Sequence, residues 1–165
     1  MTAALVAELA PKTAYAKRLA RDLVTYEWEV DRHRRLRDAA VIEAYRRLCH
    51  RELTVGVLKA ASDPNRREMI PAGKEAREEW ALQLSFDLIS TRPKERRAAE
   101  TAFVDLTDQS IDDLVARAWR SDTARAHDER IRDLERRRRL LRPEYDRLQS
   151  AGRPEIADAE IVTAA

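Results

Sequence analysis

The stretch HDERIRDLERRRRLLRPEYDRL, residues 127–148, has the apolar spacing of a coiled coil. Its seam alternates intervals of four and three residues and consists of His127, Ile131, Leu134, Arg138, Leu141, Tyr145 and Leu148. This alternation predicts a helix that packs lengthwise against another helix. Pro143 lies inside the run but outside the seam, and we expect it to kink or restart the helix.

A partner of similar length is predicted over residues 12–53, where no proline or glycine intervenes. Its seam consists of Tyr15, Leu19, Leu23, Tyr26 and Val30, continued by His33 and Arg37. At ~1.5 Å per residue such a helix extends for about 60 Å, so it needs a long partner. We therefore predict an all-α fold, an elongated antiparallel helical hairpin that joins residues 12–53 to residues 111–148.

The hairpin has an expected register. If Leu53 lies near Ile111, the numbers of paired residues sum to about 164. His33 then faces Ile131, and Trp28 lies near Arg136. An intermolecular coiled coil, in which the same seams meet in a dimer, is the alternative.

Residues 55–105 are predicted to form a small helical cap. Turn signals at Gly56, residues 63–65 (DPN) and Pro71 end the first long helix, with a short helical piece over residues 57–62. Helices are expected over residues 74–88 and 93–103, and Ser110-x-x-Asp113 resembles a capping box. The tryptophans Trp28, Trp80 and Trp119 are interpreted as core or cap anchors, with Phe86 and Phe103 in the cap.

Composition supports one helical domain over residues 1–150, followed by a loosely ordered tail, residues 151–165. Charged residues make up 38% of the chain, aromatic residues 5%, and there are three glycines, which is typical of long solvated helices rather than of sheets. The single cysteine, Cys49, fits a reducing cytoplasm. We expect no signal peptide and no membrane association, because no run of 18 apolar residues occurs.

Arginines form two local clusters, although the net charge is only +2. Residues 31–37 carry a net +3 and residues 129–142 a net +4. In the expected register they form one band that could bind a polyanion, and the alternative is a solvated face neutralised by nearby acids. The candidate polyanion-binding residues are Arg32, Arg34, Arg35, Arg37, Arg130, Arg132, Arg136, Arg137 and Arg139.

Three polar residues interrupt the seams: His33, His127 and Arg138. A buried charge is costly unless it is paired, so we expect Arg138 to extend to solvent or to pair with Glu27 or Glu29. Polar seam residues most often set register and oligomeric state. Neither the histidines nor Cys49 has the convergent ligands that a metal needs, and no phosphate-loop or nucleophile motif occurs. We expect no metal and no cofactor.

Two stretches resemble a group of small all-helical proteins of unassigned function from alphaproteobacterial genomes. Residues 22–41 (DLVTYEWEVDRHRRLRDAAV) are similar to the first long helix of that group. Residues 106–139, which begin LTDQSIDDLVARA, are similar to its C-terminal part. The resemblance implies an all-helical bacterial cytoplasmic protein and brings no activity, ligand or site residue.

The sequence therefore favours a non-enzymatic interaction or scaffold protein. Its partner would be another protein or a second copy of the chain. The alternative is a nucleic-acid-associated accessory protein that uses the arginine clusters.

Overall fold

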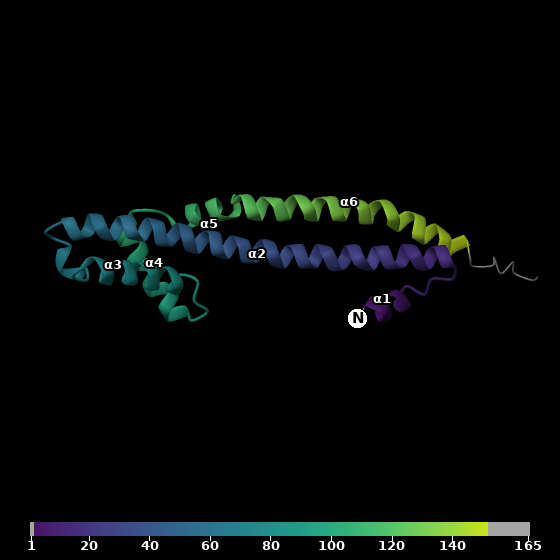
Figure 1. Cartoon of the computed structure of the whole chain (residues 1–165), viewed down its shortest axis with the longest axis horizontal. Coiled ribbons are helices and arrows are strands. Elements are labelled where there is room, and N and C mark those ends of the chain that lie inside the picture. Colours follow the sequence, from purple (N-terminus) through teal and green to yellow (C-terminus); the bar gives the residue numbers. More distant parts are fainter. Residues whose placement is uncertain (1, 152–165) are drawn as a thin grey trace, which may run out of the picture. The chain divides into compact units, whose positions relative to one another are not determined.

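The computed structural model describes residues 2–151, and these residues are helical without any strand (Figure 1). The elements are α1 (Thr2–Glu8), α2 (Ala14–Ser62), the 3-10 helix η1 (Arg67–Met69), α3 (Lys74–Asp87), α4 (Pro93–Thr107), α5 (Ile111–Trp119) and α6 (Asp122–Ala151). The predicted all-α fold is confirmed. Within the described range, no helix is both long enough and apolar enough to cross a bilayer. The expected tail lies outside the described residues, except for Ala151.

The chain divides into two compact units. The terminal unit comprises Met1–His33 and Glu129–Ala165, and the central unit comprises Arg34–Asp128. Helices α2 and α6 each contribute one part to each unit. Each unit is described by itself.

In the terminal unit, the first part of α2 runs antiparallel to the last part of α6. Val30 is buried against Ile131 and Leu134, and the Tyr15 hydroxyl donates a hydrogen bond of 2.6 Å to Glu144. A larger cluster contains Val6, Ala16, Leu19, Ala20, Leu23, Val24 and Tyr145. Most apolar residues of the two predicted seams are thus buried or partly buried between these antiparallel segments, whereas Tyr15 is 50% exposed.

Helix α1 was not anticipated from the sequence. Val6 of α1 packs in the apolar cluster that contains Leu19 and Tyr145. The Tyr145 hydroxyl also donates a hydrogen bond to the Leu9 carbonyl oxygen, just after α1. Of the two outcomes expected at Pro143, a kink or a restart, helix α6 shows the first, because it continues to Ala151 and bends in this stretch (Figure 1). Burial of Tyr145 just beyond the proline holds the helix in place despite the lost backbone hydrogen bond.

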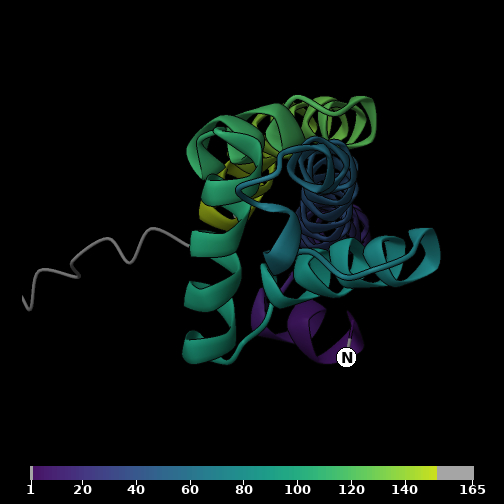
Figure 2. The same cartoon turned by 90° about the vertical axis from the view of Figure 1, so that its left-hand side faces the viewer.

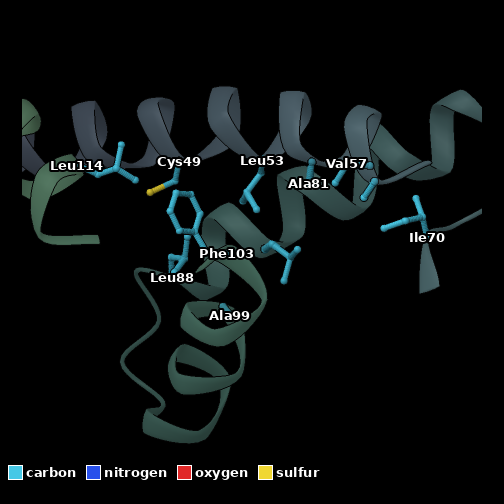
Figure 3. Packing of buried hydrophobic residues seen from close by; sticks show 11 residues of the cluster. Cys49, Leu53, Val57, Ile70, Ala81, Leu88, Ala99, Phe103 and Leu114 are labelled. Carbon is cyan, nitrogen blue, oxygen red and sulfur yellow. The ribbon is translucent and has the colours of Figure 1, made fainter. Parts of the chain in front are cut away.

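In the central unit, α3 and α5 lie on different sides of α2, and α4 crosses beside it (Figure 2). The core contains Leu53 and Val57 of α2, Ala81 of α3, Leu88 just after α3, and Phe103 of α4 (Figure 3). The predicted cap helices are therefore present, and α4 is one turn longer than expected. Phe103 is fully buried, as predicted, whereas Phe86 is largely exposed.

Helix α2 does not end near Leu53 as predicted but continues to Ser62. Gly56, taken from the sequence as a turn signal, is buried inside the helix. A Cβ at this position would lie 2.5 Å from the Leu106 carbonyl oxygen. The glycine therefore permits close packing of backbones rather than a turn.

The second long helix is broken where we predicted continuity. Helix α5 ends at Trp119, Arg120 and Ser121 form a turn, and α6 begins at Asp122. Ser121 and Asp122 are residue types that favour the start of a helix. Ser110 does precede α5, but its side chain makes no capping hydrogen bond, so the predicted capping box is not formed.

Candidate functional site

Most predicted arginines of the terminal unit pair with acids along their own helix. The pairs are Arg32–Glu29 at 3.6 Å, Arg130–Asp133 at 3.3 Å, Arg137–Asp133 at 3.0 Å and Arg139–Glu135 at 3.7 Å. Arg132 also has an interaction partner. Arg136 is exposed and forms no ion pair with any residue that the structure describes. Local acids thus neutralise much of this cluster.

In the central unit, the Arg37 side chain contacts three neighbouring side chains. It donates hydrogen bonds to Asp38 and Asp128, at 2.9 and 3.1 Å, and both raise its pKa. Its guanidinium also lies 5.2 Å from the centre of the Trp119 ring. Arg34 and Arg35 are exposed and have partners of their own. That the two arginine clusters form one polyanion-binding band stays a prediction.

Of the three polar seam residues, Arg138 has the clearest geometry. It forms an ion pair with Glu27, one of the two acids expected for it. His33 is half-buried, with Nε2 3.8 Å from Glu29, and His127 is half-buried in the central unit. The residue numbers of Arg138 and Glu27 sum to 165, as do those of Arg37 and Asp128, so both units keep the expected register within one residue.

Two of the three tryptophans are not core anchors, contrary to prediction. Trp28 and Trp119 are exposed, and each lies beneath an arginine, Arg32 at 5.6 Å and Arg37 at 5.2 Å. Only Trp80 packs against the core. A cation above the ring lets an aromatic side chain stay at the surface.

An apolar patch occupies the surface of α2 and α3 in the central unit. It consists of Ile42, Leu82 and Phe86, which are 54%, 39% and 47% exposed. Arg46 lies over the Phe86 ring at 5.0 Å and donates hydrogen bonds to Glu43, which lower the pKa of that carboxyl. The patch therefore combines apolar surface with adjacent charges of both signs.

A groove of about 480 Å³ lies in the same unit between α2, α5 and the start of α6. Its α2 wall has an apolar part, Ala40, Ala44 and Leu48, and a basic part, Arg47 and Arg51. The opposite wall consists of Arg117, Ser121 and Thr123. Three arginines thus line the groove together with Ala40, Ala44 and Leu48, which form its apolar floor. We call this feature the arginine groove.

Two carboxylates position these guanidinium groups. Glu52 accepts hydrogen bonds from Arg117 at 3.1 Å and Gln109 at 2.8 Å, and lies 3.5 Å from Arg51. Burial opposes ionisation of Glu52, but these hydrogen bonds and nearby charges lower its pKa overall. Glu43 accepts the Nε hydrogen bond of Arg47 at 2.9 Å. Four arginines, Arg46 included, thus share two carboxylates, which leaves a local excess of positive charge.

Ser121 is the residue just before α6, where a hydroxyl usually caps the helix. Its Oγ atom is buried and has no hydrogen-bond partner among the described residues. The first N–H groups of α6, before that of Arg125, also lack acceptors within the helix. A negatively charged group bound here would accept hydrogen bonds from the Ser121 hydroxyl and from these N–H groups, and the positive end of the helix dipole would stabilise it.

Cys49 does not contribute to a site. It is fully buried, and burial raises the pKa of its thiol to about 11. Within residues 2–151, no three His, Cys, Asp or Glu side chains converge in a way that could hold a metal. Its neighbour His50 is half-buried.

The arginine groove was missed at the sequence level, although one signal pointed to it. The numbers of Arg47 and Arg117 sum to 164, the expected register, so the hairpin already placed them opposite each other. Arg51 lies one helical turn from Arg47. The break before Ser121, which completes the groove, was not predicted.

Comparisons with protein-family profiles, with curated proteins and with solved structures found no match to this chain. The resemblance to the alphaproteobacterial proteins therefore stays a prediction.

Proposed function

We propose that the protein is a non-enzymatic interaction or scaffold protein that self-associates through the apolar patch Ile42, Leu82 and Phe86. The observation that carries this proposal is the exposure of Ile42, Leu82 and Phe86 together with the Arg46–Phe86 contact, because Ile42 lies one helical turn from Arg46 and Leu82 one turn from Phe86. Large apolar side chains that gather at one place on a surface mark an interaction site, whereas single ones are ordinary.

A second copy of the chain is the occupant that the charges favour. A two-fold interface brings the same patch of two copies together, so each charge must meet its opposite. Glu43 and Arg46 lie beside the apolar side chains, one acidic and one basic. In an antiparallel pairing, Arg46 of one copy can approach Glu43 of the other, so the patch is complementary to itself.

Sedimentation velocity over a wide concentration range tests this proposal. We expect the wild-type chain to shift from monomer to dimer, and the double variant Ile42→Gln, Phe86→Gln to stay monomeric at the same concentrations. Leu140→Gln is the matched control, because Leu140 is 69% exposed but lies in the terminal unit. A wild-type chain that is monomeric throughout, or a dimer that the double variant leaves intact, would refute self-association through this patch.

A nucleic-acid-associated role is the second candidate, and exposed Arg136 within the run of residues 136–139 favours it. We expect any duplex binding to weaken steeply with salt, and the salt slope to fall when Arg136, Arg137 and Arg139 become Gln. No retention of a labelled DNA or RNA duplex at low salt would exclude this role.

A further inference from the structure

We propose that the arginine groove binds a small organic polyphosphate, with its phosphate groups among Arg47, Arg51 and Arg117 and its organic part against Ala40, Ala44 and Leu48. The lining of the groove shares no residue with the apolar patch, although Glu43, which lies beside the patch, also accepts a hydrogen bond from Arg47 of the groove.

The arginines keep donors for a ligand. Arg47 donates its Nε hydrogen bond to Glu43, and its two terminal nitrogens make no hydrogen bond with any residue that the structure describes. Arg51 approaches Glu52 only at 3.5 Å, and both Arg47 and Arg51 have well-exposed side chains. A guanidinium offers five N–H donors in a planar fork that matches the oxygens of a phosphate. Each of these arginines is thus oriented by one carboxylate and keeps N–H donors for a ligand.

The carboxylates near the groove do not prevent an anion from binding in it. Each Glu52 oxygen accepts a hydrogen bond, one from Arg117 and one from Gln109, and Glu43 accepts hydrogen bonds from Arg46 and Arg47. Asp122, at the start of α6, is exposed and does not line the groove. Neither of the two carboxylates that hold the arginines belongs to the lining itself.

The size and floor of the groove indicate what kind of anion fits. A volume of about 480 Å³ falls within the roughly 300–1,000 Å³ of small-ligand pockets and greatly exceeds one phosphate group. Three guanidinium groups on two walls suit several phosphate groups at once. The apolar floor then contacts a part of the ligand that carries no charge. A nucleoside triphosphate has both properties, whereas an inorganic polyphosphate has only the first.

The start of α6 supplies a second set of donors. Ser121 and Thr123 line the groove, and the Ser121 Oγ is the buried side-chain oxygen left without a partner in the described part of the chain. Because Ser121 does not cap α6, the first N–H groups of that long helix remain without side-chain acceptors from it. A phosphate oxygen at this point would satisfy groups that the fold leaves open.

Isothermal titration of the full chain with ATP tests the proposal, with inorganic tripolyphosphate as the comparison that lacks an organic part. We expect ATP to bind more tightly than tripolyphosphate, and Arg51→Gln and Arg117→Gln each to weaken ATP binding by roughly tenfold, the effect of one charged hydrogen bond. Arg96→Gln and Arg97→Gln, on the surface of α4, are the matched controls and should leave it unchanged.

Backbone amide spectra add a readout of position. We expect ATP to shift the Thr123 and Ala124 amide resonances, and Ser121→Ala to weaken binding without unfolding the chain. If Arg117→Gln destabilises the fold through the loss of its Glu52 contact, Arg51→Gln still tests the groove. The proposal fails if ATP does not bind, if tripolyphosphate binds as tightly as ATP, if the α4 controls weaken binding equally, or if a 20-base-pair duplex binds more tightly than ATP through the same arginines.

Discussion

Gly56 lies so close to the Leu106 carbonyl oxygen that a Cβ atom at position 56 would stand 2.5 Å from it, and 3.2 Å from the Thr107 methyl group. Helix α2 and the end of α4 therefore meet backbone to backbone. The first of these neighbours is a carbonyl group, which cannot rotate away as a flexible side chain would. This contact makes position 56 sensitive to the smallest possible side chain.

We expect Gly56→Ala to lower the free energy of unfolding by about 1–3 kcal/mol, the usual cost of overpacking a core. Helix propensity alone predicts the opposite sign, because alanine in a helix interior is favoured over glycine by roughly 0.5–1 kcal/mol. Chemical denaturation of the variant therefore decides between the two effects. A variant more stable than the wild type would show that α2 and α4 do not approach as described.

Tyr145→Phe should release helix α1. The Tyr145 hydroxyl donates a hydrogen bond to the Leu9 carbonyl oxygen just after α1, and it accepts one from Gln149 at 3.0 Å. The ring stays buried in the variant, so only about 1 kcal/mol is expected to be lost. In the variant, amide hydrogen exchange of residues 2–9 should be faster than in the wild type, whereas exchange in the central unit should not change. Equal protection of α1 in both proteins would contradict this role for the hydroxyl.

Cys49 should be unreactive in the folded chain. Its side chain is fully buried, and the pKa of its thiol is raised to about 11, so the reactive thiolate is scarce at pH 8. We expect negligible labelling by a thiol reagent in buffer and complete labelling in strong denaturant. Labelling in buffer at the rate of a small free thiol would show that the core around Phe103 opens readily.

Glu52 gives the central unit a defined response to acid. Its pKa is lower in the folded chain than the ordinary value of 4.5, so its contribution to stability is complete above that value and disappears as the pH falls through the folded pKa. Glu52→Gln should therefore flatten the loss of stability below about pH 4.5. Arg117→Ala should remove part of the same contribution, and the double variant should lose less than the two single losses added together. Fully additive losses would mean that the two side chains act separately.

The spacing of apolar residues predicted much of the fold because it reflects local periodicity. The two long helices follow from seams such as Tyr15 to Val30 and Ile131 to Tyr145, and the register close to 164 follows once a hairpin with Leu53 near Ile111 is assumed. What spacing cannot show is how a residue is used in three dimensions. Gly56 serves close packing instead of a turn, and Trp28 and Trp119 are exposed beneath arginines instead of buried.

The same limit applies to the candidate sites. A run of charges such as residues 136–139 stands out in the sequence, yet acids one turn away on the same helix pair with several of its members. Arg47, Arg51 and Arg117 do not stand out, because the third arginine comes from a distant segment. The register of the hairpin brings Arg117 opposite Arg47, whereas Ser121 and Thr123 reach the groove through the turn at Arg120 and Ser121, which interrupts an otherwise continuous helical pattern.

Arg138 offers a direct test of whether a polar seam residue sets the register. Its side chain is 36% exposed and that of its partner Glu27 is 59% exposed, so the ion pair is screened and contributes at most ~0.5 kcal/mol. Arg138→Leu should therefore leave stability unchanged or raise it, because leucine completes the apolar seam. If Arg138 sets the register, the variant should also populate a second alignment. Cysteines introduced in place of Tyr15 and Glu144, whose side chains are in contact, would report the original alignment, and cysteines at position 15 and at position 140 or 148, one helical turn away, would report a shifted one. A leucine variant that cross-links only in the original alignment would show that the neighbouring apolar contacts, Val30 with Ile131 and Leu134, fix the register without Arg138.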